Sequence, residues 1–195
     1  VAVRLGIDVV SLANNHATDH GRDGLLETMQ TLSDLGIDWV GAGADIEAAH
    51  RPLVREVNGL RIAFLAYEGW HATLPPTEKE AGVVWLKFPD FIDEIAAARA
   101  EADLVIILVH WGLEYHATPR TQEQTVAKQM ADAGADLIIG HHPHVVQTVE
   151  WIQGAGRPHR TLVAYSLGNF LFDQGFQDDV MEAVILHCDV GKDGV

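Results

Sequence analysis

The sequence predicts an α/β fold in which strands and helices alternate along the chain. Short runs of β-branched and aliphatic residues, of which residues 103–109 (DLVIILV) are the most apolar, have the length and composition of buried strands. Stretches with apolar residues at helical spacing, such as residues 21–35, separate several of these runs. Polar turns follow several of the strands directly. Alternation of this kind is typical of layered α/β folds.

In the first half of the chain, each predicted element has its own local signal. Leu25, Met29 and Leu32 lie at positions i, i+4 and i+7 and give one apolar helix face. Asn58-Gly59 is the favoured two-residue turn between hairpin strands. Residues 68–87 contain two tryptophans and two prolines without periodicity, which predicts a long loop of the kind that often carries function. The elements predicted here are strands at 6–12 and 37–40, a helix at 21–35, and a hairpin of strands at 53–57 and 60–67.

In the second half, the signals are a helix start and two strands that are apolar on both faces. Thr118 as N-cap and Pro119 at the first helical position predict the start of a helix. Because one helix joins the apolar runs at 104–109 and 136–139, we expect them to be adjacent buried strands. The elements predicted here are helices at 91–102 and 118–133, strands at 103–109, 136–139, 161–166 and 180–190, and an extended segment at 145–151.

Composition excludes several classes of protein. Thirteen basic against 28 acidic residues give a formal charge of −15, which argues against non-specific binding to nucleic acid or to an anionic membrane surface. The single cysteine, Cys188, excludes an internal disulfide framework, and no apolar run of about 18 residues is present to span a bilayer. Val1 is not a methionine and begins an apolar segment. We therefore expect residues 1–195 to be a single domain that is truncated at its N-terminus.

Histidine-bearing turns follow three of the predicted strands. They are Asn15-His16, His110 and His142-Pro143-His144. The carboxyl ends of neighbouring strands converge on one crevice in layered α/β folds, and imidazole is the commonest metal ligand, which an amide oxygen can accompany. Any one of these histidines alone fits a surface or structural role, but three at strand ends favour a metal site. Its nitrogen and oxygen donors suit Mn, Fe or Zn.

Further polar residues lie near these turns. Asp19 and Asp173, together with Asn169 in the turn before Asp173, are candidates to orient a ligand histidine by hydrogen bonding. A helix-entry or turn position explains the two aspartates equally well. Glu114 follows His110 closely enough to act as a catalytic acid or base, or to contact substrate, although a solvated surface position fits it as well.

Four motifs, taken together and in this order, resemble the poly-γ-glutamate capsule-synthesis (CapA) family, which is similar to the calcineurin-like metallophosphatases. The resemblance implies a metallophosphatase-like sandwich of two mixed β-sheets flanked by helices, with a two-metal site at the strand ends. The motifs are Ser11–His16 with Asp19 and Gly21, His110-Trp111-Gly112-x-Glu114-Tyr115, Gly140–Gln147, and Tyr165–Phe170 with Phe172-Asp173.

The resemblance also implies roles for individual residues. His16 matches the catalytic histidine that contacts the leaving or transferring group, Asn15 and His110 match ligands of the second metal, and His142 and His144 match a pair with one ligand to each metal. The family's Gly-Asp motif and a later acidic element lie upstream of this sequence. We therefore expect two divalent ions in the full-length protein and about one in this chain, held less tightly as the pH falls through about 6.5.

The function implied is biosynthesis or anchoring of poly-γ-glutamate or a related capsule polymer, with a metal site that serves a hydrolase or transferase reaction. One alternative is a metal-dependent phosphoesterase acting on a small molecule or nucleotide, and another is a non-catalytic protein that binds or assembles the polymer. The expected partner is an anionic polymer or a phosphorylated substrate, with no nucleic acid. The resemblance places such proteins at the bacterial cell envelope, outside the cytoplasm, with membrane attachment only through segments outside this sequence.

Overall fold

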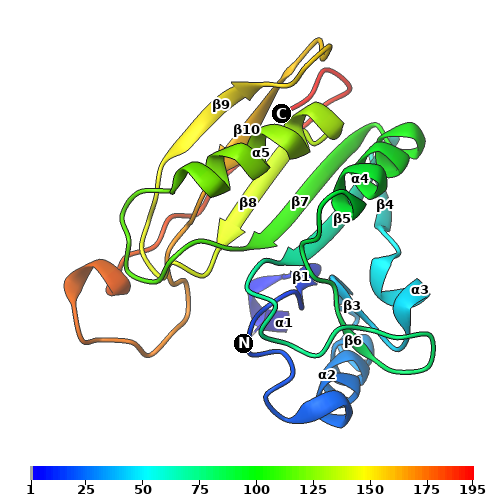
Figure 1. The fold of residues 1–195 in the computed structure, drawn as a ribbon, viewed down its shortest axis with the longest axis vertical. Coiled ribbons are helices and arrows are strands. Elements are labelled where there is room, and N and C mark those ends of the chain that lie inside the picture. The colour runs from blue at the N-terminus through cyan, green and yellow to red at the C-terminus, as the bar shows by residue number, and fades with distance from the viewer. Residues whose placement is uncertain (1) are drawn as a thin grey trace.

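The computed structural model describes residues 2–195 and is organised around a six-stranded mixed sheet (Figure 1). The central four strands are parallel, and each edge strand is antiparallel to its neighbour. The strands, in spatial order, are β4 (Leu53–Val57), β5 (Leu60–Glu68), β7 (Leu104–His110), β8 (Leu137–His141), β10 (Arg160–Ala164) and β9 (Val149–Gln153). The prediction that the two most apolar runs are neighbouring buried strands is confirmed by the pairing of β7 with β8.

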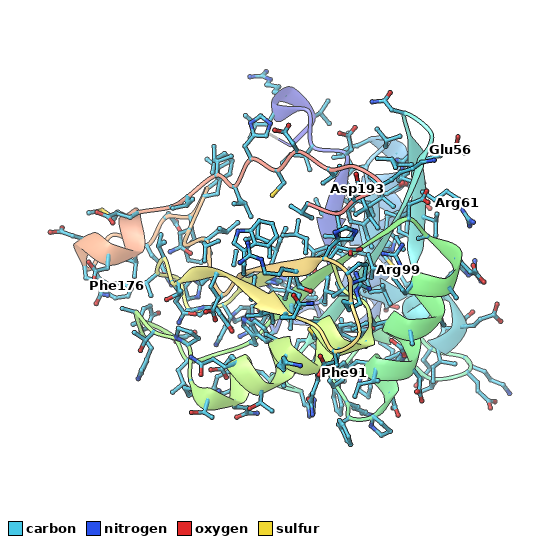
Figure 2. All side chains as sticks on the ribbon, turned by 90° about the horizontal axis from the view of Figure 1, so that it is seen from above. Glu56, Arg61, Phe91, Arg99, Phe176 and Asp193 are labelled. Carbon is cyan, nitrogen blue, oxygen red and sulfur yellow. The ribbon has the colours of Figure 1, made fainter. Side chains whose placement is uncertain are left out.

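The two faces of this sheet have different covers. Helices α4 (Asp90–Glu101) and α5 (Thr121–Ala133) lie on one face (Figure 1), where Val105 and Ile107 of β7 join their core. On the opposite face Leu104 and Ile106 belong to a second cluster, which the C-terminal segment contacts through Leu186, Cys188 and Val195. Figure 2 shows this layering from above, with Phe91 of α4 and Asp193 of the C-terminal segment on opposite sides of the sheet. Because successive residues of a strand point to opposite faces, a strand covered on both sides must be apolar throughout, as β7 is up to His110.

The smaller elements gather at one end of the large sheet (Figure 1). Leu25 and Met29 of α2 pack against Val40 and Ala42, and this cluster reaches Ala66 of β5. The elements are α1 (Ala2–Leu5), the parallel pair β1 (Val9–Ser11) and β2 (Asp38–Val40), α2 (Gly21–Asp34), the antiparallel pair β3 (Ala42–Gly43) and β6 (Gly82–Val83), and α3 (Ile46–His50). The α/β class and the mixed multi-stranded sheet are as predicted.

Three details of the prediction were wrong. Residues 180–190 do not form a strand, because no strand among residues 2–195 pairs with them. A 3₁₀ turn, η1 (Asp178–Met181), is followed by extended chain, which within the same residues has only the isolated bridge Gly168–Ala183. The second long helix begins at Thr121 and not at Thr118, because Arg120 is extended and the Glu123 carboxylate accepts its backbone N–H at 2.7 Å. Helix α3, which the Asp45 carboxylate caps, was not predicted.

Within residues 2–195, none of the helices has both the length and the apolar character needed to cross a membrane.

Candidate metal centre

Three parallel strands bring polar residues to the same edge of the large sheet. Glu68 of β5 is in register with His110 of β7, which is in register with His141 of β8. The three side chains therefore point to one face, opposite α4 and α5, at the carboxyl ends of their strands. His142 and His144 follow β8 directly at this edge.

The turn after β8 has an unusual backbone. His142 and His144, on either side of Pro143, have φ values of 103° and 62° in the left-handed region that non-glycine residues rarely adopt. Gly140, the second-last residue of β8, precedes this turn, and a Cβ there would lie 2.1 Å from the Tyr165 carbonyl oxygen, so no larger residue fits. A conformation of this kind costs about 1–3 kcal/mol per residue and occurs mainly at functional sites.

The histidine rings lie close together. The ring centroids of His110 and His142 are 4.5 Å apart, and those of His142 and His144 are 6.0 Å apart. One ligand atom each from Glu114, His142 and His144 lies within 4.8 Å of the others. Glu114 reaches this position because the turn after β7 is held to the turn after β8, where the Tyr115 N–H donates to the Pro143 carbonyl at 2.8 Å.

Two of these imidazoles are buried without hydrogen-bond partners. His110 is 3% exposed and His142 is 7% exposed, and within the described residues neither ring nitrogen of either one has a partner. Buried polar atoms in folded proteins are almost always paired. A divalent cation would satisfy imidazole nitrogens in this position, so the residues present fit a metal ion.

The electrostatic environment keeps these rings neutral. Burial, followed by the neighbouring histidines, lowers the pKa of His110 to about 2. Burial also lowers the pKa of His142 to about 4, against the opposing effect of Glu114. The neutral imidazole is the form that binds a metal. The loss of affinity expected at about pH 6.5 is therefore revised, since these pKa values keep both rings available well below that pH.

The hydrogen bond between His144 and Asn169 fixes the orientation of the His144 ring. The Asn169 side-chain oxygen accepts from His144 Nδ1 at 2.8 Å, which leaves Nε2 facing Glu114 at 3.9 Å. The Asn169 amide in turn donates to the Val180 carbonyl at 2.9 Å. Asp173 is exposed, and no hydrogen bond joins it to a histidine in the described part of the chain.

The loop after β1 lies beside the histidine cluster. The Ala13 carbonyl is 3.4 Å from His141 Nε2, and a charge on His16 contributes to lowering the pKa of both His110 and His142. His16 itself is exposed, with Nδ1 2.9 Å from the Asp19 carboxylate. Asn15 lies between these residues, and within residues 2–195 its amide makes no hydrogen bond to the histidines.

Two residues at this edge, Glu68 and Trp70, were not predicted from the sequence. Glu68 is fully buried, and its carboxylate accepts hydrogen bonds from the backbone N–H groups of Trp70 and Ala72 and from the Thr73 hydroxyl. This network holds the start of the loop, where the Trp70 ring packs 5.1 Å from the ring of His142. The available signal was a charged residue that ends an apolar strand and precedes Gly-Trp.

Replacement of Glu68 is expected to loosen this loop. Glu68→Ala leaves two backbone N–H groups and the buried Thr73 hydroxyl without their acceptor, so we expect the free energy of unfolding to fall by about 1–3 kcal/mol. Urea unfolding measures the change. Glu78→Ala, an exposed glutamate of the same loop, is the control and should change the free energy by less than about 0.5 kcal/mol. Equal stability of the two variants would contradict a structural role for the Glu68 carboxylate.

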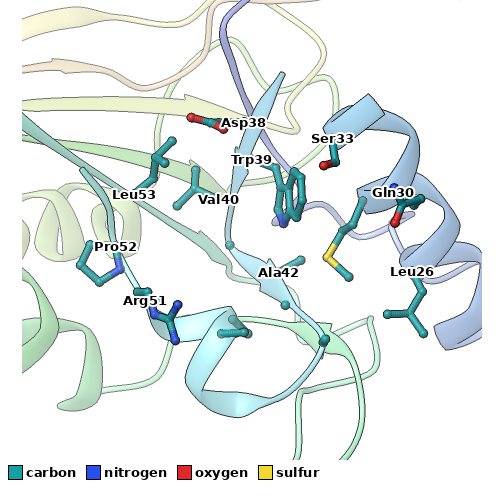
Figure 3. A pocket seen from close by; sticks show the side chains of 16 residues that line it. Leu26, Gln30, Ser33, Asp38, Trp39, Val40, Ala42, Arg51, Pro52 and Leu53 are labelled. Carbon is teal, nitrogen blue, oxygen red and sulfur yellow. The ribbon is translucent and has the colours of Figure 1, made fainter. Parts of the chain in front are cut away.

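One cavity of the molecule lies away from the histidines. It has a volume of about 480 Å³ and lies between α2, β2 and the segment from β3 to β4 (Figure 3). Trp39, Val40, Ala42 and Leu53 line it, and none of the candidate ligands does. The histidine cluster therefore lies at the edge of the sheet and outside this cavity.

Comparison with known proteins gives a consistent result. The sequence profile described as "Bacterial capsule synthesis protein PGA_cap" matches residues 1–174. The chain is 37% identical over 177 residues to the capsule biosynthesis protein CapA of Bacillus anthracis, covering 88% of this chain and 41% of the relative. It is also 37% identical over 174 residues to the PGA biosynthesis protein CapA of Bacillus subtilis strain 168, covering 88% and 44%. The chain thus spans about two fifths of these relatives.

Solved structures show the fold. A 5′-nucleotidase precursor from Thermus thermophilus superposes with a TM-score of 0.57 at 15% identity, over 94% of this chain and 38% of that one. The sulfate thiohydrolase SoxB of the same genus gives a TM-score of 0.55 at 18% identity, over 86% and 29%. The expected metallophosphatase-like fold is confirmed by these neighbours.

Proposed function

The chain belongs to the bacterial capsule synthesis protein family PGA_cap, and on that premise we propose that it takes part in making or anchoring poly-γ-glutamate or a related polymer through a divalent metal centre. The observation that carries the metal centre is the pair of buried imidazoles, His110 and His142, whose ring nitrogens have no partner within the described residues. We propose His144 and Asn15 as further ligands.

The donor set indicates which ions would be held. Neutral imidazole nitrogens with an amide oxygen and one carboxylate suit Mn²⁺, Fe²⁺ or Zn²⁺. Glu114 supplies the carboxylate, since it lies with His142 and His144 in the one group of potential ligands found in residues 2–195. We propose about one ion in this chain and two in the full-length protein.

The chain's own side chains would then divide the work of a phosphoryl or acyl transfer. A bound divalent ion supplies Lewis acidity for such chemistry. The Asp19 carboxylate requires the proton of His16 on Nδ1, so His16 Nε2 is free to exchange a proton with a leaving or transferring group. Asn169 keeps His144 oriented, and Trp70 shields one side of His142 from water.

Metal titration tests the proposal. In calorimetry with Mn²⁺ or Zn²⁺, the chain should bind about one ion per molecule, and His142→Ala should weaken affinity by at least about 100-fold, the upper range for losing a group that only supports a ligand. His187→Ala is the control, because this histidine is fully exposed and distant in sequence. An unchanged isotherm for His142→Ala would refute the centre. Two tightly held ions would refute the proposed ligand count.

Enzymology separates the catalytic roles. Mn²⁺-dependent turnover of a generic phosphodiester by the full-length protein would favour the phosphoesterase alternative. Binding of the polymer that survives replacement of His16 would favour a non-catalytic role in assembly.

A further inference from the structure

A second cavity adjoins the candidate metal centre. It has a volume of about 230 Å³, and we call it the Arg120 cavity. The residues that line it are Gly69, Trp70, Leu86, Trp111, Gly112, Arg120, Gln122, Glu123 and Val126. Trp70 also packs on the His142 ring, with centroids 5.1 Å apart, and a Cβ at Gly112 would lie 3.2 Å from Pro143. Trp70 therefore borders both the cavity and the histidine cluster.

The cavity contains a cation that is held in a fixed orientation. The Glu123 carboxylate, whose side chain is only 4% exposed, accepts from Arg120 Nε at 3.1 Å and from Nη2 at 2.6 Å. A guanidinium has five N–H donors in a rigid fork. Its Nη1 edge has no partner among residues 2–195, and the side chain is 40% exposed. Arg120 can therefore receive a second carboxylate without giving up the first.

The rest of the lining indicates what would carry that carboxylate. The indole rings of Trp70 and Trp111, with Leu86 and Val126, offer apolar walls for methylene groups, and Gln122 offers donors and an acceptor for an amide. A carboxylate on a short aliphatic arm beside an amide is the chemistry of a γ-linked glutamyl unit. The chain's net charge of −15 would repel a polyanion, so productive binding requires a local, pre-oriented cation.

We propose that the Arg120 cavity binds the α-carboxylate of the γ-glutamyl unit adjacent to the group held at the metal centre, with Arg120 as its anchor. This inference rests on the proposed function, because the unit bound here belongs to the polymer on which the metal centre would act.

The test is binding of a short γ-linked oligoglutamate to the Mn²⁺-loaded full-length protein. The variant is the double substitution Arg120→Gln with Glu123→Gln, which leaves no buried carboxylate unpaired and keeps glutamine at the capping position of α5. We expect its affinity for the oligomer to fall roughly 10- to 100-fold, the range for a hydrogen bond to a charged group. Lys128→Gln, which removes one exposed positive charge from the same helix, should change the affinity less than about twofold.

A second probe makes the assignment specific. We expect an oligomer with amidated α-carboxylates to bind the unaltered protein as weakly as the acid form binds the double variant. In the double variant, amidation should cause no further loss of affinity. An equal loss for Lys128→Gln would overturn the proposal. Protein that binds Mn²⁺ but not the oligomer would overturn the inference and leave the metal centre standing. Protein that binds neither would overturn the proposed function itself.

Discussion

His16→Ala is expected to lower turnover by the full-length protein about 10²- to 10⁴-fold while leaving its metal content nearly intact, the usual effect of losing an acid or base group. The physical reason is the contrast in exposure. The side chain of His16 is 72% exposed and hydrogen-bonded to Asp19, whereas His110 and His142 are buried without partners among the described residues. A side chain in that position can meet substrate, but it is not enclosed as the proposed ligands are.

Steady-state kinetics and elemental analysis check this prediction together. His20→Ala is the matched control, because His20 is an exposed histidine of the same loop, and it should retain turnover within about twofold. Asp19→Asn should give a smaller loss than His16→Ala, since it disturbs only the tautomer and orientation of the ring. Loss of metal in His16→Ala would instead make His16 a ligand.

Lowering the pH from 7 to 5 is expected to reduce the free energy of unfolding of the metal-free protein by about 6 kcal/mol. In the folded chain burial lowers the pKa of His110 to about 2 and the pKa values of His141 and His142 to about 4, whereas an unfolded histidine titrates near 6.5. The unfolded state therefore binds more protons between those values, and stability falls as the pH drops below 6.5. Each of the three rings accounts for about 2 kcal/mol over this range, at 1.36 kcal/mol per pKa unit.

Urea unfolding in the presence of a chelator, at pH 7 and at pH 5, measures this loss. His142→Gln removes one of the three titrating groups, so its stability should fall by only about 4 kcal/mol over the same range. His187→Gln changes an exposed histidine and should behave like the unaltered chain. Stability that stays constant from pH 7 to pH 5 would show that these imidazoles are not held neutral by burial.

The parts of the fold that depend on local pattern were predictable from the sequence. Residues 104–109 are apolar on both faces, which is enough to place β7 inside the sheet. Residues 180–190 have a composition equally suited to a strand, but a strand also needs a partner, and the described chain supplies only one isolated bridge at Ala183. Strand pairing depends on segments that are distant in sequence, so the composition of residues 180–190 alone does not predict it.

The candidate site likewise has features that the sequence could predict and features that it could not. The gathering of histidines at the sheet edge could be predicted because His110 and His142 each come at the end of an apolar strand. The approach of Glu114 to His142 and His144 depends on a hydrogen bond between two turns, from Tyr115 to Pro143, that are far apart in sequence. Glu68 could not be assigned a role, because its three donors come from a loop without periodicity.

The register that aligns Glu68, His110 and His141 also limits where the chain can change length. Strand β7 has seven residues whose side chains alternate between the two faces of the sheet. One residue inserted or deleted within it would turn His110 toward α4 and α5 and bring Val109 or Trp111 into its place. The same holds for β5 and β8, whose ends face His110. We therefore expect the chain to tolerate changes in length in connecting segments such as the exposed residues 77–80. Insertions there leave the relative phase of the three strands unchanged, and a tag or reporter group placed there would leave the spacing of the histidines intact.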